Sequence, residues 1–303
     1  MTKEKIVHHA TATIGFDLCR ISTPFVSEHL EEYRSWINNQ EEGDMQYLAR
    51  HLPMKENPNL LLEGVQSAVV VAKNYKNTNK QYLKGNRKIA RYAVGKDYHS
   101  ILQVQLEALA TFIKSLYPYA KTYVGVDSRP IPERSLALQA GIGFRGKNTM
   151  VIRPKMGSYF LLGVLYTTIP LAQDTPFQGS CGTCTRCIDA CPTKALTDEG
   201  KMIAKRCISY ATIEHKSVLD TSVINAMDGW IFGCDICQEV CPFNHVHIPL
   251  TNWSDFYPES GVGFDFFKED REKSCEEIPK NSALYRSRKR VIGNLRSLKK
   301  ERP

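Results

Sequence analysis

The chain has 303 residues, of which 42% are hydrophobic and 24% are charged, and its formal net charge is +8 at pH 7. These values are ordinary for a soluble globular protein and allow a sizeable core in two domains. The chain opens MTKEKIVHHATATIG without an apolar signal core, and no stretch is long and apolar enough to cross a bilayer. We therefore expect a cytoplasmic protein with no membrane segment.

The first part of the chain mixes helical and strand patterns. Helical periodicity runs from Ser27 to Arg50 with a break at a Gly-Asp pair, and the β-branched run from Ser67 to Ala72 predicts a buried strand. The polar, basic segment from Asn74 to Arg87 predicts a loop. Apolar steps of three and four from Ile101 to Leu116 then predict an amphipathic helix.

The pattern continues to about residue 168. Lys121–Asp127 predicts a second strand, and Glu133–Ala140 predicts a helix that ends at Gly141. Thr149–Arg153 and Ser158–Thr167 flank a PKMG turn and predict a hairpin. Strands mixed with helices indicate a mixed α/β sheet domain, so the predicted fold class is α+β with this domain first.

Three glycines in the middle of the chain, Gly141, Gly143 and Gly146, spell the dinucleotide fingerprint G-x-G-x-x-G. That fingerprint requires a strand before it and a helix after it, so that pyrophosphate meets a helix N-terminus. Here a helix is expected before it and a strand after it, which argues against a nicotinamide or flavin site. We interpret GIGFRGKN as a glycine loop that lets backbone lie close to a flat or bulky ligand.

Eight of the ten cysteines form two runs. CGTCTRCIDACP has the spacing C-x2-C-x2-C-x3-C-P, and CDICQEVCP is preceded at a distance by Cys207. Three cysteines two residues apart can bind three corners of a [4Fe–4S] cube, whereas the cysteine before proline ligates the other cube in two-cluster ferredoxins. The spacing predicts one cube on Cys181, Cys184, Cys187 and Cys241, and a second on Cys191, Cys207, Cys234 and Cys237.

Two other interpretations of these cysteines are weaker. C-x2-C pairs also bind zinc, but a third cysteine at the same step and a fourth before proline are not the usual zinc spacing. A secreted disulfide framework would suit a small chain with a signal segment. Cys19 and Cys275 lie outside the pattern and are interpreted as ordinary thiols.

The linker PLAQDTPFQGS separates the sheet domain from the cysteines. We therefore predict three parts: a catalytic sheet domain at 1–168, a ferredoxin-like domain with two clusters at 169–250, and a short basic helical tail at 251–303. A chain with two such clusters carries electrons.

Several motifs in this order resemble the epoxyqueuosine reductases, which are relatives of the reductive dehalogenases. They are RYAVGKDYH at Arg91–His99, VDSRPIPERSLALQAGIGFRGKN at Val126–Asn148, GSYFLLG, and both cysteine runs. The resemblance covers nearly all of residues 10–300. It implies that the sheet domain binds cobalamin, that the second domain holds two [4Fe–4S] clusters, and that the substrate is epoxyqueuosine at the wobble position of a tRNA.

The implied reaction removes the epoxide oxygen and leaves queuosine, the last step of queuosine biosynthesis. It needs two electrons, and protons for the departing oxygen. Because iron–sulfur cubes deliver electrons singly, a cofactor with a reactive low-valent state is required, and a cobalt corrin can supply it. An external one-electron reductant, such as a flavodoxin or ferredoxin, is also implied. Some family members extend into a C-terminal helical-repeat domain, which we do not expect in a chain that stops at Pro303.

Asp127 is the candidate general acid. It ends a predicted strand and begins a loop, where site residues often lie. Burial beside an apolar corrin would raise its pKa, so that it would hold a proton near neutral pH. The alternative is a turn-starting aspartate that caps SRPIPE. The resemblance favours the acid, because the aspartate at this VDS position is the proton donor of the family.

The resemblance also implies contacts to cobalamin. They are Lys55, Ala93, Asp127, Lys147, Asn148, Gly157, Ser158, Ser209 and Asp235. Lys55 stands where the family more often has arginine, and a solvated surface charge is its alternative. Ser209 and Asp235 flank cluster cysteines and would otherwise cap local turns. His99 is expected to cap or pack at a helix start and is not proposed to bind cobalt.

The tail LYRSRKRVIGNLRSLKK concentrates positive charge. Such residues make salt-sensitive contacts to phosphates, so the implied tRNA substrate favours a nucleic-acid surface over a merely solvated helix face. The candidate contacts are Arg286, Arg288, Lys289, Arg290 and Arg296. An extruded wobble nucleotide would enter the pocket, and no residue is assigned to it.

Two other functions fit part of the sequence. A corrinoid reductase of a small molecule, such as a halogenated compound, would not need the basic tail. A ferredoxin-like electron carrier would contain no corrin.

Overall fold

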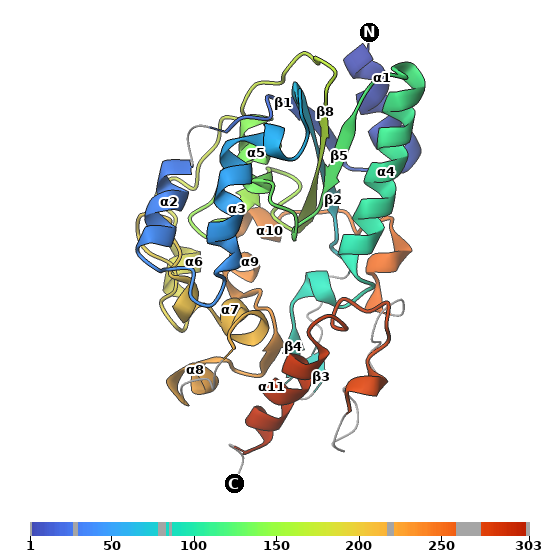
Figure 1. The fold of residues 1–303 in the computed structure, drawn as a ribbon. Helices are drawn as coiled ribbons and strands as arrows, with labels where there is room; N and C mark the ends of the chain where they lie inside the picture. The colour runs from blue at the N-terminus through green and yellow to red at the C-terminus, as the bar shows by residue number, and fades with distance from the viewer. Residues whose placement is uncertain are drawn as a thin grey trace.

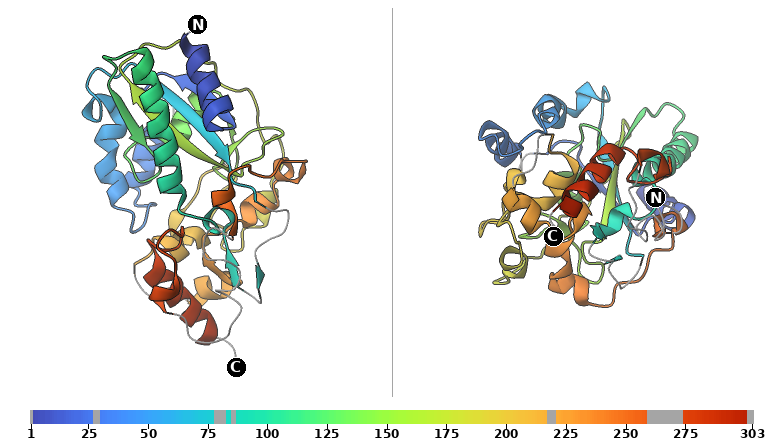
Figure 2. Two further views of the ribbon diagram at one scale, coloured as in Figure 1. Left: turned by 90° about the vertical axis from the view of Figure 1, so that its right-hand side faces the viewer. Right: turned by 90° about the horizontal axis from the view of Figure 1, so that it is seen from below.

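The computed structural model describes residues 2–26, 30–77, 83–84, 87–216, 221–258 and 274–300. The fold is mixed α/β, as predicted, and has two stacked halves. A helix-covered sheet forms the upper half of Figure 1, and the cysteine-bearing segment forms the lower half. Figure 2 shows the same stacking from the side, with the C-terminal helix in the lower half.

The bounds of the elements follow the chain. The helices are α1 (Thr2–His8), α2 (Leu30–Asn38), α3 (Tyr47–Glu56), α4 (Tyr98–Leu116), α5 (Glu133–Gln139), α6 (Arg186–Asp189), α7 (Ile208–Ile213), α8 (Thr221–Ala226), α9 (Ile236–Glu239), α10 (Pro242–His245) and α11 (Arg288–Lys300). The strands are β1 (Leu18–Ser22), β2 (Ser67–Asn74), β3 (Leu83–Lys84), β4 (Arg87–Ile89), β5 (Thr122–Gly125), β6 (Phe144–Arg145), β7 (Val151–Ile152), β8 (Phe160–Thr167) and β9 (Trp230–Phe232).

A four-stranded antiparallel sheet, in the order β1-β2-β8-β5, forms the centre of the upper half. Strand β2 is buried at every position, which explains its unbroken run of small and β-branched residues. Because successive side chains point to opposite faces, Val69 and Val71 join the core with α1 and α4, whereas Val70 joins the core with α5. The strand predicted at Ser67–Ala72 is confirmed.

Helix α4 confirms the amphipathic helix predicted from the sequence. Asp97 caps its N-terminus by accepting a hydrogen bond from the backbone N–H of His99 at 3.1 Å. The side chains that face the sheet recur at steps of three and four and are buried: Leu102, Leu106, Leu109, Ala110 and Ile113. The cap therefore fixes Tyr98 and His99 in the first turn of a well-anchored helix.

The lower half combines segments that are far apart in the sequence. Strand β4 pairs in parallel with β9, so the segment just before α4 lies beside the cysteine segment. Helix α11 packs on α7 and β9, and its Val291, Ile292 and Leu295 are buried there. The tail is consequently part of this half, with an apolar face turned inward and basic residues left for the surface.

The predicted hairpin after residue 149 is wrong in its pairing. Strand β7 pairs with β6, which precedes it, and β8 pairs with β2 and β5. The PKMG turn closes only an isolated bridge between Arg153 and Gly157. Strand β8 is largely buried at the centre of the sheet, and its burial against two neighbouring strands outweighs the local turn signal.

The glycine loop is also corrected. As expected, helix α5 precedes it and strand β6 follows it, in the order opposite to a dinucleotide site. The glycines, however, admit the protein's own backbone. A Cβ on Gly141 would lie 2.2 Å from the Thr175 carbonyl oxygen, and one on Gly143 would lie 2.3 Å from that of Ile152. They allow close packing of the linker and β7, in place of a ligand.

The other element predictions hold with shifted ends. Helices α2 and α3 replace the interrupted pattern from Ser27 to Arg50, and residues 27–29 lie outside the described part. The loop predicted at Asn74–Arg87 contains the short strand β3, while residues 78–82 and 85–86 lie outside the described part. Within the described residues, no helix is long and apolar enough to cross a membrane.

Candidate functional site

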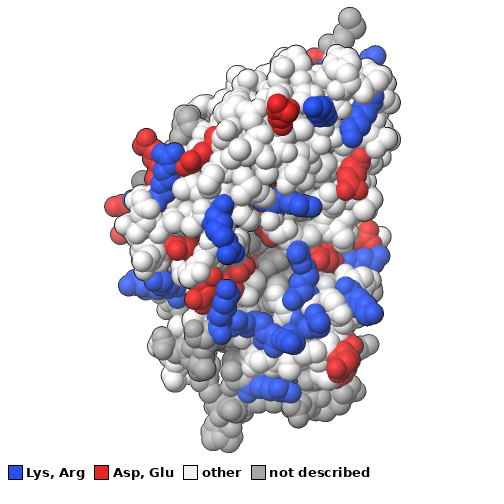
Figure 3. All heavy atoms as spheres, in the orientation of Figure 1, with Lys and Arg blue, Asp and Glu red and all other residues white. Residues whose placement is uncertain are grey.

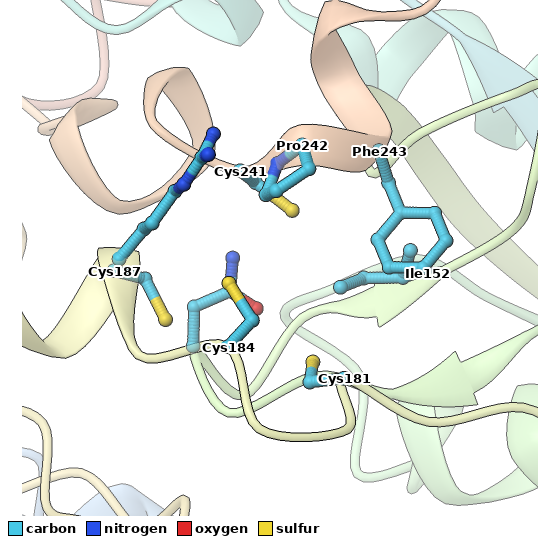
Figure 4. Close-up of a pocket in the computed structure, with 9 residues that line it drawn as sticks. Ile152, Cys181, Cys184, Cys187, Cys241, Pro242 and Phe243 are labelled. Atoms are coloured by element: carbon cyan, nitrogen blue, oxygen red, sulfur yellow. The ribbon is translucent and has the colours of Figure 1, made fainter.

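Four cysteines from two distant segments surround one pocket in the lower half. Cys181 and Cys184 come from the turn that leads into α6, Cys187 lies in α6, and Cys241 comes from the turn between α9 and α10. Figure 4 shows their sulfur atoms directed toward a common space, with Ile152, Pro242 and Phe243 beside them. Asn148 also lines this pocket. The structure thus brings together the four residues predicted to hold the first cube.

The other four cysteines form a second group. Burial raises the pKa of the Cys234 thiol to about 12, and the thiols of Cys207 and Cys191 add to the effect. Burial likewise raises the pKa of Cys237, with Cys234 and Cys207 among its neighbours. Binding of iron would therefore have to displace protons from these thiols, as metal binding to cysteine generally does.

The two cysteine groups are adjacent. Helices α6 and α9 pack together, and Cys187 and Cys237 belong to one apolar cluster with Ile188. Asn148 lines the first pocket, and its side-chain amide donates a hydrogen bond to the backbone carbonyl of Cys237 at 3.3 Å. Two redox centres held by these groups would be close neighbours.

A line of three side chains lies at the N-terminus of α4. His99 Nδ1 is 2.6 Å from Asp97 Oδ1, and His99 Nε2 is 2.9 Å from Asp127 Oδ2. Asp127 follows the end of β5 with a φ of +46°, a left-handed conformation that non-glycine residues adopt seldom. The side chain of Asp127 is 59% exposed, so its carboxylate faces an open space. Asp127 and His99 are thus arranged for proton transfer.

The location of the proton corrects one expectation. Partial desolvation by its neighbours would by itself raise the pKa of Asp127, but the contact with His99 outweighs this effect and lowers the pKa below the ordinary value. The pKa of His99 is raised to about 9, because hydrogen bonds to Asp127 and Asp97 outweigh its burial. In this structure the proton near neutral pH therefore resides on His99, and Asp127 is ionised.

Sequence reasoning missed Glu133, the first residue of α5. Its Oε1 accepts a hydrogen bond from the backbone N–H of Asp127 at 2.5 Å. Burial and the Asp127 carboxylate raise the pKa of Glu133 to about 8. Glu133 lies six residues after Asp127 in a proline-containing segment, and this spacing does not predict a contact between the two residues. His99 is expected from the sequence to cap or pack at a helix start; Asp97 is the cap, and the contact of His99 with Asp127 depends on the approach of β5 to α4.

Lys55 lies close to this carboxylate group. It donates a hydrogen bond to the Tyr33 hydroxyl at 3.2 Å, and its Nζ is 4.4 Å from the centroid of the Tyr33 ring. Burial lowers the pKa of Lys55, while Glu133 and Asp127 raise it. The predicted residue is therefore half-buried at the site and is not a solvated surface charge.

Asp235 is hydrogen-bonded to the short helical turn that contains Ala93. Asp235 is 1% exposed, and its Oδ2 accepts the backbone N–H of Arg91 at 2.7 Å. Burial raises the pKa of Asp235 to about 7. Within the described residues, its buried Oδ1 has no hydrogen-bond partner. This orphaned acceptor fits a bound group that carries an N–H or O–H donor.

Gly157 and Ser158 are held by the cysteine-bearing half. Ser158 donates hydrogen bonds from its backbone N–H to Asn244 at 2.8 Å and from its hydroxyl to Gln238 at 2.9 Å. A Cβ on Gly157 would lie 2.1 Å from the same Asn244 oxygen. The Ser158 hydroxyl is therefore used within the protein. Lys147 donates its backbone N–H to the Cys181 sulfur at 3.4 Å, and Ser209 lies in the first turn of α7.

Individual basic residues act electrostatically on the acids around Asp127. Figure 3 shows Lys and Arg side chains around the middle of one face of the molecule, with acidic side chains among them. Arg286 lowers the pKa of Asp97, and Arg290 lowers that of Glu214, so two of the five tail residues act on acids near the site. Arg288 stacks on Tyr285 at 4.2 Å instead, and Lys289 and Arg296 are exposed.

Fold and site together define a class: a mixed α/β iron–sulfur protein with two cysteine groups beside an ionisable pocket. Comparison with known proteins agrees. Residues 180–244 match the family model "4Fe-4S double cluster binding domain", and residues 55–128 match "Epoxyqueuosine reductase QueG, DUF1730". The chain carries two [4Fe–4S] clusters, and zinc is excluded as the interpretation of the cysteines.

Curated relatives narrow the class to one family. An epoxyqueuosine reductase of Cyclobacterium marinum is 36% identical over 94% of this chain and 92% of its own length. The Escherichia coli epoxyqueuosine reductase is 34% identical over 94% of this chain and 76% of its own length. The chain belongs to the epoxyqueuosine reductase family.

Solved structures show the same fold. The epoxyqueuosine reductase from Streptococcus thermophilus is similar with a TM-score of 0.83 and 29% identity, over 98% of this chain and 81% of that one. An epoxyqueuosine reductase crystallised with an epoxyqueuosine-modified stem loop of tyrosine tRNA has a TM-score of 0.84 and 28% identity, over 98% and 80%. The Bacillus subtilis enzyme, with the same scores and coverage, has been solved with its catalytic aspartate loop swung out of the active site.

Proposed function

We propose that this protein reduces epoxyqueuosine to queuosine at the wobble position of tRNA in the cytoplasm, with electrons passed through two [4Fe–4S] clusters to cobalamin. The observation that carries the proposal is the pair of adjacent four-cysteine groups in the same chain as the open Asp127–His99 site. The curated relatives named above are epoxyqueuosine reductases. Their similarity to this chain does not favour the two alternative functions, a reductase of a small molecule or a plain electron carrier.

The reaction sets the requirements for the residues. Both carbon–oxygen bonds of the epoxide break, an alkene remains, and the oxygen leaves as water after it takes up two electrons and two protons. When bound, the cobalt corrin supplies a low-valent metal centre that the protein side chains cannot provide. The protein must hold the clusters, position the substrate and deliver protons to the departing oxygen.

The cysteine groups meet the first requirement. We assign one cube to Cys181, Cys184, Cys187 and Cys241 and the other to Cys191, Cys207, Cys234 and Cys237. The mutual effects of the thiols on their pKa values support this division. Cys241 is influenced by Cys181 and Cys184, whereas Cys207 is influenced by Cys191. A flavodoxin- or ferredoxin-like protein would supply electrons one at a time.

We assign the cobalamin site to the junction of the two halves. The orphaned Oδ1 of Asp235 is an acceptor suited to a corrin amide, and Ala93 lies two residues from its partner Arg91. Lys55 and Asp127 approach from the sheet half. The remaining proposed contacts are the turn residues Lys147, Asn148, Gly157, Ser158 and Ser209, with Ser158 restricted to its backbone carbonyl. The proposed domains are 1–168 for cobalamin, 169–250 for the clusters and 251–303 for the tail.

Asp127 and His99 meet the need for protons. The Asp127 carboxylate is exposed and can approach a substrate oxygen, while His99 holds a proton behind it. We propose that one of the two protons is held by His99, passes through the 2.9 Å contact to the Asp127 carboxylate, and is delivered from there to the departing oxygen. The positive charge of His99 also limits the repulsion between the Asp127 carboxylate and the substrate's developing oxyanion.

The basic tail residues would bind the tRNA backbone. Arg286 and Arg290 act on acids beside the site, so we propose that they contact the phosphates flanking the wobble nucleotide. Lys289 and Arg296, which are exposed on α11, would contribute a longer-range attraction. Arg288 would act mainly by orienting the tail through its contact with Tyr285.

The test is turnover of an epoxyqueuosine-containing tRNA stem loop by anaerobically purified protein with added cobalamin and a one-electron reductant. We expect queuosine from the wild type and a rate at least about a hundredfold lower from Asp127→Asn. Asp228→Asn is the matched control, because Asp228 also has a positive φ, of 44°, and a cation partner, Lys88. Full turnover by Asp127→Asn would remove the proposed acid, and no turnover by the wild type would remove the function.

A further inference from the structure

The loop that carries Asp127 has a backbone conformation that must be held in place. Asp127 has a φ of +46°, in the left-handed region where a side chain meets its own backbone. Residues in such conformations are strained and persist only where neighbouring contacts fix them. The loop's tip, at Ser128 and Arg129, is exposed. Neighbouring contacts must therefore hold Asp127 in this conformation.

Both ends of the loop are anchored. Ile131 is 3% exposed in the core with α5, and its Cδ1 would lie 2.3 Å from a Cβ on Gly125, so the chain on either side of the loop is tightly packed. Between these anchors, Asp127 makes three contacts, one of which is a side-chain hydrogen bond with Tyr98. The Asp127 side chain also meets His99, and its backbone N–H donates to Glu133 Oε1 at 2.5 Å.

We propose that Glu133 is a positioning residue that holds the Asp127 loop in its inward conformation when it is uncharged and releases it when it is ionised. This inference rests on the proposed function, because it concerns delivery of the catalytic carboxylate. Glu133 is the first residue of α5, and its carboxyl reaches back to the residue that needs support. Nothing in its role requires contact with substrate.

The charge around Glu133 explains the dependence on its protonation. The groups that act on it electrostatically are Asp127 in the loop, Lys55 on α3, Arg134 on α5, Tyr98 on α4 and Tyr166 on β8. Burial and the Asp127 carboxylate raise the pKa of Glu133 to about 8. Below that pH it is neutral and still accepts the N–H. Above it, ionised Glu133 accepts the N–H more strongly, but the repulsion between its carboxylate and that of Asp127 is the larger effect, and the loop is driven outward.

Variants of Glu133 separate its role as a hydrogen-bond acceptor from the effect of its negative charge. E133L removes both, whereas E133Q keeps a carbonyl acceptor of the same shape and cannot ionise. Gln139→Leu is the control at the other end of α5, where Gln139 donates to Ser22 at 2.6 Å, far along the helix from the loop. All three variants are compared with the wild type as cluster-loaded protein.

The first readout is amide hydrogen exchange of the peptide that contains Asp127. We expect E133L to lose protection there and to turn over epoxyqueuosine tRNA about tenfold more slowly, because the hydrogen bond that fixes the Asp127 backbone is lost. E133Q and the Gln139 variant should keep that protection. Retained protection and full turnover in E133L would overturn the proposal.

The second readout is the alkaline side of the pH–rate profile. In the wild type we expect the rate to fall as Glu133 ionises near pH 8, and in E133Q we expect the fall to move toward pH 9, where His99 loses its proton. If the pH–rate profile of E133Q is the same as that of the wild type, the proposal is contradicted. This comparison tests the proposal even if E133L fails to fold. If the wild type does not turn over the tRNA, the proposed function fails, and hydrogen exchange at pH 7 and 9 still tests the loop.

Discussion

The interaction of His99 with two carboxylates predicts how stability depends on pH. The pKa of His99 is raised from 6.5 to about 9 by Asp127 and Asp97, and its side chain is 22% exposed. A raised pKa in the folded state means that folding and protonation favour each other. The stabilisation is fully present below pH 6.5 and is lost as the pH rises through about 9.

The magnitude follows from the difference between the two pKa values. At ~1.4 kcal/mol per pKa unit, the rise from 6.5 to 9 corresponds to about 3 kcal/mol of unfolding free energy. The lowered pKa values of Asp97 and Asp127 describe the same contacts from the other side, so they are not added to this figure.

The assay compares the wild type with His99→Gln by urea unfolding under anaerobic conditions across this pH range. Because both proteins carry the same clusters, the difference between their unfolding free energies isolates His99. We expect the wild type's advantage to be largest near pH 6 and to shrink by about 3 kcal/mol by pH 9.5. A difference that stays constant with pH would refute the assignment of the proton to His99.

Two further predictions test the junction and the tail. Gly157→Ala should lower the unfolding free energy by about 1–3 kcal/mol, because Gly157 has a φ of +69° and the added Cβ would meet Asn244. Gly200→Ala is the control, because Gly200 has a similar φ of +73° but its Cβ would have no contact under 3.5 Å, and it should lower stability less in a thermal melt. Equal losses of stability in the two variants would contradict the packing argument. The double variant Arg286→Ser/Arg290→Ser should weaken stem-loop binding and reduce the slope of log K against log salt by about 1–2, and an unchanged slope in a binding titration would show that neither residue contacts phosphate.

The sequence predicted the elements whose signals are local. Helix α4 and strand β2 follow from periodicity and β-branched composition, because α4 buries one continuous face and β2 is buried along its whole length. The grouping of the cysteines was also predictable, since C-x2-C-x2-C fixes three sulfur positions within one turn. The pairing of β7 with β6 was not predictable from the PKMG turn, because the central position of β8 is decided by strands far away in the sequence.

The site was predictable in part. Asp127 was found from its motif, but the sign of its pKa shift depends on His99, which arrives from another element. No sequence motif indicates that Glu133 contacts Asp127. Its role in holding the loop is visible only in the structure, where Asp127 has a positive φ. Electrostatic consequences of this kind depend on distances between elements, which residue spacing along the chain does not determine.

The central claim is that the two clusters and the corrin act together on the epoxide of a tRNA nucleoside. Mass spectrometry of the wobble nucleoside after anaerobic reaction tests this most directly, with cobalamin, clusters or reductant omitted in turn. We predict loss of one oxygen atom only when all three are present. Loss of that oxygen without cobalamin, or none with the complete system, would contradict it.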